Sequence, residues 1–344
     1  MTDAEASRPH RAARLEDRGR ARLESLLRRR GWQAAVVPHV GYGGDGWVRA
    51  LARVVLVPPG WSGTGREDGR GWRRFVTTAA VGATVTVRLG GHTHRVTAGR
   101  EGYVDERLAS DLEPGWATAT YSVEDSPPVP AQVRIVGPGA TLGMVSDIDD
   151  TVIETNLPRP LVAFRNAFIT KETDRRPVAG MSELYAEITA AHPDIFVVYV
   201  STGAWNTAVP LTAFLARHGY PPGPLLLTDW GPTLDGWFRS GQAHKRAQLT
   251  ALFADLPQLR WLLVGDDGQH DPELYAEAAA AEPDKVLGVA LRQVSLAQQV
   301  AYGHLTSPEL TGGNGLHDPV SARDGYGLRD ALRTRGILLA GSES

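Results

Sequence analysis

Hydrophobic and polar positions follow two different patterns along the chain, and the change falls near residue 139. Between residues 32 and 138, short runs rich in Val, Thr and aromatic residues are separated by Gly and Pro, as in all-β domains. Residues 139–305 instead alternate apolar runs with segments of helical periodicity. The pattern predicts a small all-β sandwich domain followed by a doubly wound, Rossmann-like α/β domain with a parallel sheet.

The expected elements of the second region alternate regularly. The apolar runs predict strands, and the amphipathic segments between them predict helices. The expected strands cover residues 141–146, 195–200, 225–227, 261–264 and 286–290, and the expected helices 180–191, 207–218, 244–254 and 272–281. In the first region the clearest signal is a hairpin over residues 84–96, which alternates with period two around Gly90–Gly91.

Both ends of the chain differ from these two regions. Residues 1–31 are polar and arginine-rich, and the apolar residues between Arg14 and Arg30 recur at helical spacing, so we expect an N-terminal amphipathic helix. It could lie on an anionic membrane, or it could dock on its own chain with its charges solvated, which is the commoner arrangement and the favoured interpretation. Residues 306–344 are Gly-rich and polar and predict a tail with one short helix over 327–339.

Composition narrows the class of protein. The chain has 344 residues, no cysteine and a net charge of -3. The lack of cysteine excludes disulfides, thiolate metal sites and cysteine nucleophiles, and the charge argues against a general nucleic-acid partner. No run is apolar enough to cross a bilayer, and the N-terminus lacks the apolar core of a signal peptide. We therefore expect a cytoplasmic protein with no transmembrane segment, which the N-terminal helix could make peripheral at the membrane.

A cluster of acids at the end of the strand over 141–146 is the strongest chemical signal. The sequence Ser-Asp-Ile-Asp-Asp-Thr begins at Ser146, directly after apolar residues. Crowded carboxylates are costly to desolvate without a cation, and Asp147 and Asp149, two residues apart, face one crevice if the backbone stays extended. A surface turn or a helix N-cap is the alternative. The buried strand before the acids favours a catalytic interpretation.

Three further motifs follow at strand or helix ends. Ser201-Thr202-Gly203 ends the next strand and suits phosphate oxygens, although the same residues are common in turns. His244-Lys245 is expected to open a helix and to place a cation near the acids. A last apolar run ends in Gly265-Asp266-Asp267-Gly268-Gln269-His270-Asp271-Pro272, where carboxylates suit Mg2+ and Asp271 could also cap a helix before Pro272.

These four motifs, in this order, resemble the motifs of the haloacid dehalogenase superfamily of phosphohydrolases, whose first motif is Asp-x-Asp-x-Thr (DxDxT). Together they are similar to the catalytic domain of the actin-patch-associated phosphatidate phosphatases and their bacterial relatives, over roughly residues 139–294. A β-rich segment before that domain is also similar to bacterial members. The family's Asp-Ser-Gly has Asp267 in place of Ser here, which adds an acid to the site.

The resemblance implies specific roles. Asp147 would be the nucleophile that becomes aspartyl-phosphate, Asp149 the general acid and base, and Lys245 the cation beside them. Thr151 would support the loop, Ser201 would contact the phosphoryl group, and Thr202 and Gly203 would supply backbone donors. Mg2+ would be bound by residues of the first and fourth motifs, namely Asp147, the backbone carbonyl of Asp149, and Asp266, with Asp267 or Asp271 as the supporting acid.

The function implied is a Mg2+-dependent phosphoric monoester hydrolase that converts phosphatidate to diacylglycerol and phosphate, an enzyme of lipid metabolism. Physical reasoning from the residues supplies only a phosphate ester as substrate. Two alternatives therefore stay open: a phosphatase of a soluble phosphoester or phosphoprotein, and a non-catalytic scaffold acting through its β domain. The insert over 156–178 is too short for a large cap domain, so the site should be open to a bulky substrate at a membrane surface.

Overall fold

The computed structural model describes residues 19, 22–61, 78–124, 126–154, 175–228, 234–268, 270–294 and 318–338. The first turns of the predicted N-terminal helix, nearly all of the insert after the first motif, and residues 306–317 and 339–344 of the predicted tail lie outside the described residues. Within the described part, residues 22–29 are helical. No helix among the described residues is both long and apolar enough to cross a bilayer.

The N-terminal region is all β, as its short alternating runs predict. Its strands pair in the order β1-β3-β2-β8-β7-β4-β5, and β6 pairs with β3. The printed pairings of β1 with β3 and of β4 with β5 and β7 are antiparallel, whereas β2 and β8 run parallel. The bounds are β1 Gln33–Pro38, β2 Gly41–Gly44, β3 Trp47–Val57, β4 Thr84–Leu89, β5 His92–Thr97, β6 Tyr103–Ala109, β7 Gly115–Val123 and β8 Val129–Ile135.

The predicted hairpin over residues 84–96 is β4 and β5, paired from Thr84↔Thr97 to Leu89↔His92 around Gly90–Gly91. Two strands were not predicted. β2 is only four residues long and contains three glycines, and β6 carries three consecutive charged, exposed residues, so neither shows a clear alternation.

The C-terminal region is the predicted parallel sheet. Its strand order is β11-β10-β9-β12-β13-β14, and every pairing printed for it is parallel. The strands are β9 Leu142–Ser146, β10 Phe196–Ala204, β11 Leu225–Thr228, β12 Arg260–Asp266, β13 Val286–Arg292 and β14 Val320–Ala322. Their almost continuous burial is what covering helices on both faces produce. The fold class is thereby confirmed.

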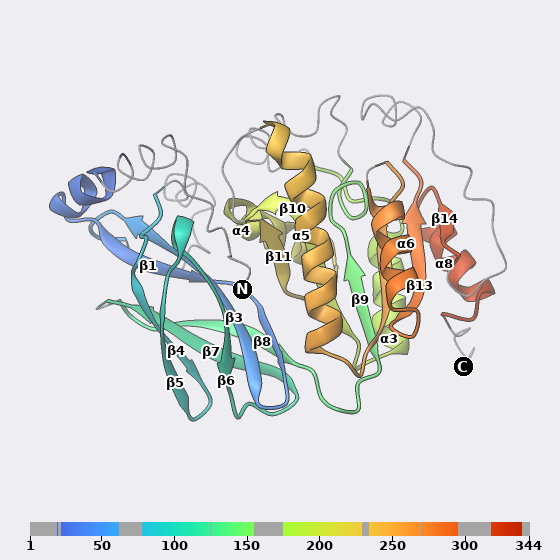
Figure 1. The fold of residues 1–344 in the computed structure, drawn as a ribbon, viewed down its shortest axis with the longest axis horizontal. Coiled ribbons are helices and arrows are strands. Elements are labelled where there is room, and N and C mark those ends of the chain that lie inside the picture. Colours follow the sequence, from blue (N-terminus) through green and yellow to red (C-terminus); the bar gives the residue numbers. More distant parts are fainter. Residues whose placement is uncertain are drawn as a thin grey trace, which may run out of the picture. The chain divides into compact units, whose positions relative to one another are not determined.

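The chain reverses its direction across this sheet at β9. From β9 it continues outward to β10 and β11, and it then returns to β12 on the other side of β9. Helices α5 and α6 lie in contact in front of the sheet in Figure 1, and α3 contacts α8. A reversal of this kind opens a crevice at the carboxyl ends of the two flanking strands, where ligands bind in such folds. The helices are α3 Met181–Ala191, α4 Ala208–Arg217, α5 Leu234–Asp255, α6 Asp271–Ala281 and α8 Gly325–Thr334.

Two features of this region differ from the prediction. His244-Lys245 does not open a helix, because α5 already begins at Leu234 and is 22 residues long. The segment before Lys245 contains Gly236 and Gly241 and lacks a clear apolar stripe, which hid its helical character. Beyond residue 305, β14 pairs with β13 and α8 packs on β14 and α3, so part of the expected tail completes the sheet.

The chain divides into two compact units, and the division does not follow a single cut. One unit contains residues up to 39, 49–108 and 118–131, and the other contains 40–48, 109–117 and 132–344. The short segments 40–48 and 109–117 group with the parallel sheet, so the unit that carries the predicted site also contains β2 and, from Gln132 on, β8. The domain boundaries expected from the sequence stay a prediction.

Candidate active site

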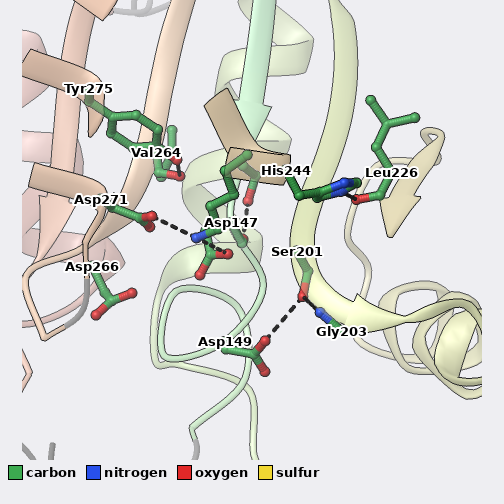
Figure 2. A network of polar contacts seen from close by, with 12 residues as sticks. Asp147, Asp149, Ser201, Gly203, Leu226, His244, Val264, Asp266, Asp271 and Tyr275 are labelled. Atoms are coloured by element: carbon green, nitrogen blue, oxygen red, sulfur yellow. Dashed lines mark hydrogen bonds and ion pairs between the residues drawn. The ribbon is translucent and has the colours of Figure 1, made fainter. Parts of the chain in front are cut away.

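The carboxyl ends of three neighbouring strands bring the predicted motifs together. Asp147 follows β9, Ser201 lies in β10, and Asp266 is the last residue of β12. Lys245 and Asp271 come from helices α5 and α6. Figure 2 shows Asp147 between Asp271 and Asp266 on one side and Ser201 on the other. All five are at most 7% exposed. The fold therefore buries at one edge of the sheet residues that are spread over more than a hundred positions of the sequence.

Lys245 connects two of the acids. Its Nζ lies 2.8 Å from Oδ1 of Asp147 and 2.6 Å from Oδ1 of Asp271. Burial opposes a charged ammonium, but the two carboxylates outweigh burial and raise the pKa of Lys245 above its ordinary value. The lysine is thus a fixed cation. Its neighbour Arg246 pairs with Glu277 on the exposed side of α5, so it cannot replace Lys245 in the site.

Asp147, Asp266 and Asp271 form a cluster that could bind a metal ion. Each offers one carboxylate oxygen, and these oxygens lie within 4.8 Å of one another. Gly265 permits this approach, because a Cβ there would meet Oδ2 of Asp271 at 2.5 Å and Tyr275 at 2.8 Å. We call these three residues the acid cluster.

The acid cluster contains buried carboxylate oxygens that suit a divalent cation. Oδ2 of Asp147, of Asp266 and of Asp271 are all buried, and none has a hydrogen-bond partner among the described residues. Buried carboxylate oxygens without partners are costly unless a cation compensates them. Three hard oxygen donors from carboxylates are the ligand type that Mg2+ prefers.

Burial and mutual repulsion disfavour ionised acids in the cluster. Burial raises the pKa of Asp147, Asp271 and Asp149 raise it further, and Lys245 opposes both effects. The pKa of Asp266 is raised by burial first and then by Asp271 and Asp147. Like charges held this close in a dry site are stabilised when a bound cation is present.

Asp149 lies on the other side of Asp147 and contacts Ser201. The Ser201 hydroxyl donates to Oδ2 of Asp149 at 3.1 Å, and the Gly203 N–H donates to the Ser201 oxygen at 3.0 Å (Figure 2). Burial, and then Asp150, raise the pKa of Asp149 to about 7. Thr151 is fully buried, and its hydroxyl has no partner among the described residues. The first and second motifs are therefore in direct contact.

Thr202 and Gly203 are held by β11. The Thr228 hydroxyl donates to the carbonyl oxygens of Thr202 and Gly203 at 3.1 and 3.2 Å. Gly241 of α5 lies against Thr202, where a Cβ would meet the threonine methyl at 3.0 Å. This contact is one physical reason for a glycine inside α5. The proposed role of Thr202 and Gly203 as phosphate donors stays a prediction.

The two candidates for the supporting acid are placed differently. Asp271 belongs to the acid cluster, whereas Oδ1 of Asp267 accepts a hydrogen bond from the Val294 N–H at 2.7 Å and Asp267 is not among the three. Asp271 is not the N-cap of α6, as the sequence had suggested, because His270 occupies that position and Asp271 is the first residue of the helix. In that position its carboxylate reaches Lys245.

Arg292 was not predicted from the sequence, although it touches the first motif. Its guanidinium donates to the Asp150 carbonyl oxygen at 2.9 Å and lies 3.8 Å from Oδ1 of Asp150. Asp150 is fully buried and has a φ of 56°, which is uncommon for a residue other than glycine. Arginine is abundant in this chain, so the presence of Arg292 at the end of a strand did not indicate a role in the site.

Tyr185 also stabilises the first motif, through a hydrogen bond to Ser146. The Ser146 hydroxyl donates to the Asp147 carbonyl oxygen at 2.6 Å and shares a hydrogen bond of 2.7 Å with the Tyr185 hydroxyl. Ser146 and Tyr185 are both fully buried. The backbone of the predicted nucleophile is thus fixed by α3 as well as by β9.

Comparison with known protein families identifies the α/β region. Residues 142–293 match the family described as "Phosphatidate phosphatase APP1, catalytic domain". The resemblance inferred from the four motifs is thereby confirmed, and the matched range includes every residue predicted for the site.

Two curated fungal proteins are similar over the same part of the chain. Phosphatidate phosphatase APP1 of Saccharomyces cerevisiae is 30% identical over 154 residues, which is 44% of this chain and 26% of the yeast protein. The uncharacterized protein C29B5.04c of Schizosaccharomyces pombe is 25% identical over 154 residues, with 44% and 25% covered. The chain thus spans about a quarter of the length of the curated relatives it matches.

Among solved structures, a carbohydrate acetylesterase from Xanthomonas citri aligns over 88% of this chain and 75% of its own, with 10% identity and a TM-score of 0.30. A likeness this low supports no conclusion about this chain.

Proposed function

Because residues 142–293 match the family described as phosphatidate phosphatase APP1 catalytic domain, we propose that this chain hydrolyses a phosphate monoester through an aspartyl-phosphate on Asp147. The substrate we propose is phosphatidate, and the products are diacylglycerol and phosphate. One observation carries the proposal: the acid cluster and Lys245 meet beside β9, where the order in which the chain adds strands to the parallel sheet reverses. Such a place combines a nucleophile with the charges that a phosphoryl group requires.

In the proposed first step, a carboxylate oxygen of Asp147 attacks phosphorus, and the bond between phosphorus and the ester oxygen breaks. Asp149 gives its proton to that oxygen, so the alcohol leaves neutral. In the second step water attacks the same phosphorus and loses a proton to Asp149. The bond to Asp147 then breaks, which releases phosphate and restores both carboxyl groups to their starting states.

The other residues of the site would stabilise negative charge on the phosphoryl oxygens. Lys245 is 2.8 Å from Asp147, close enough to stabilise negative charge on the phosphoryl oxygens. Ser201 already contacts Asp149 and is placed to donate to a phosphoryl oxygen. We assign the acid cluster to Mg2+, which when bound would neutralise phosphoryl oxygens and orient them. Asp267, engaged by the Val294 N–H, is left out of the assigned ligands.

The choice of phosphatidate depends on the family, because the site itself specifies only a phosphate ester. The name of the yeast relative supports it at 30% identity. The alternative substrates are a soluble phosphoester and a phosphoprotein, which the same residues could cleave. A substrate that lies in a membrane surface would bring the protein to that surface, which makes it a peripheral protein.

A substrate panel tests this proposal. Purified full-length chain with Mg2+ is incubated with phosphatidate in vesicles, with p-nitrophenyl phosphate and with a phosphoserine peptide, and released phosphate is measured. We expect phosphatidate to have the largest kcat/KM by far. Faster release from the peptide or from p-nitrophenyl phosphate would replace the lipid assignment, and no release from any substrate with intact folding would favour a scaffold.

A further inference from the structure

The described part of the N-terminal helix, residues 22–29, has two faces of different exposure. At 3.6 residues per turn, all of its exposed residues, with Arg30 just after it, fall in one continuous arc of about 160°. The half-buried residues Glu24, Leu27 and Arg28 fill the opposite side. The exposed arc consists of Arg22, Leu23, Ser25, Leu26, Arg29 and Arg30, and we call it the outer face.

The inner face is held by ion pairs within the same compact unit. The Arg28 guanidinium lies 3.0 Å from a carboxylate oxygen of Glu24 and 2.9 Å from one of Glu124, next to the end of β7. The helix ends with the Arg30 N–H on the carbonyl oxygens of Leu26 and Leu27. The Arg28–Glu124 pair therefore connects the inner face to the residue after β7.

The outer face combines exposed leucines with arginines. Leu23 and Leu26 lie one helical turn apart and are each 46% exposed, so they form an exposed aliphatic pair. Arg22, Arg29 and Arg30 form no ion pair within the part of the chain that the structure describes. The outer face thus presents three cationic side chains around two exposed leucines. Glu24, the acid among residues 22–29, lies on the opposite side.

We propose that the outer face binds an anionic phospholipid surface. Long arginine side chains reach lipid phosphates while neighbouring leucines enter the boundary between headgroups and acyl chains, so mixed cationic and apolar residues suit a membrane surface. A nucleic acid would use the arginines but leave both leucines in water. The inference deepens the proposed function and rests on it for its purpose, since a lipid substrate lies in such a surface.

The test measures vesicle binding separately from catalysis. Full-length protein is sedimented with vesicles of phosphatidylcholine alone and of phosphatidylcholine mixed with phosphatidylglycerol, an anionic lipid with a phosphodiester instead of a phosphate monoester. The variants are Arg22→Gln/Arg29→Gln/Arg30→Gln and Leu23→Ser/Leu26→Ser. A matched control, Arg88→Gln/Arg95→Gln/Arg217→Gln, removes three exposed arginines from other parts of the chain. Circular dichroism checks that every variant is folded.

We expect the wild type and the control to bind only the anionic vesicles, and less as salt is added. The triple arginine variant should bind roughly 100-fold more weakly, at about fivefold per lost charge, and the leucine variant roughly tenfold more weakly. Equal binding to neutral vesicles, or unchanged binding by both variants, would overturn the proposal. So would binding to duplex DNA that outcompetes vesicles and ignores the leucine changes.

Catalysis on a dispersed substrate separates this proposal from the proposed function. All variants should release phosphate from short-chain, monomeric phosphatidate at the wild-type rate, because none of the changed residues belongs to the active site. Their rates on phosphatidate vesicles should fall with their binding. If no form cleaves phosphatidate but vesicle binding follows the pattern above, the proposed function fails and the lipid-binding face stands.

Discussion

Arg292, at the end of β13, donates a hydrogen bond of 2.9 Å to the carbonyl oxygen of Asp150, in the middle of the first motif. It also reaches the Arg323 carbonyl oxygen at 3.3 Å, beside the short strand β14. The arginine thus connects the loop of Asp147 and Asp149 to the C-terminal strand and helix. Since Asp150 has a positive φ and is fully buried, this contact holds a loop conformation that its sequence alone would not favour.

Replacing Arg292 by Gln should therefore misplace the loop rather than remove a reacting group. A shift of this kind can cost on the order of 100-fold in kcat. We expect kcat to fall with little change in the concentration of Mg2+ needed for half-maximal activity, and Arg292→Lys to recover part of the rate. Steady-state kinetics with a Mg2+ titration measures both quantities. A normal kcat in a folded Arg292→Gln variant would contradict the positioning role.

Lys245→Met should abolish most of the activity. The change leaves Asp147 and Asp271 buried without their shared cation, and it removes the charge beside the reacting phosphoryl group. Loss of one such stabilising group costs roughly 100- to 1000-fold in kcat, and breaking a buried ion pair costs about 3–5 kcal/mol of stability. The next residue supplies the control. Arg246→Met breaks only an exposed pair with Glu277 and should alter neither the rate nor Tm noticeably.

Replacing Asp271 and replacing Asp267 should have opposite effects on metal binding. Mg2+ that binds only the folded chain should stabilise it by about 2.7 kcal/mol when its concentration exceeds its Kd 100-fold, and Tm should rise accordingly. In Asp271→Asn this increase should shrink strongly, because the variant removes a carboxylate of the acid cluster. Asp267→Asn should keep it, since an amide oxygen can still accept from the Val294 N–H. Differential scanning fluorimetry with and without Mg2+ decides between them, and the reverse result would move the metal ligand to Asp267.

The buried side chain of His39 should lower the free energy of unfolding in mild acid. Burial, and then the nearby Arg53, lower the pKa of its imidazole from 6.5 to about 4. Between these values the unfolded chain binds a proton that the folded chain refuses, so stability falls as pH decreases from 6.5 towards 4. The loss is on the order of 2 kcal/mol near pH 5. In His39→Gln it should disappear, whereas His92→Gln, at an exposed position, should retain it; urea denaturation across this pH range tests both.

The sequence predicted most of the α/β region because each strand and helix there carries its own periodic pattern. β9, β10 and β12 are short apolar runs that end in polar motifs, and parallel strands place those ends at one edge of a sheet. Asp147, Ser201 and Asp266 could therefore be grouped from the sequence. The identity of the motifs indicated a family resemblance, and the comparison confirmed that resemblance.

What the sequence did not predict depends on contacts between distant residues. The start of α5 was hidden by its glycines, of which Gly241 packs on Thr202 across the site. Asp271 and Asp267 look alike in the sequence, and only the path of the backbone after β12 turns the first towards Lys245 and the second towards Val294. Arg292 and Tyr185 act through a backbone carbonyl and a serine hydroxyl, which leave no motif.

The central claim is that Asp147 forms the covalent bond to phosphorus, and phosphate release from phosphatidate vesicles by Asp147→Asn tests it most directly. Asn cannot form the aspartyl-phosphate, so with Mg2+ present the folded variant should release no phosphate above background, while Asp284→Asn, at an exposed position, should match the wild type. Wild-type rates in Asp147→Asn would contradict the account.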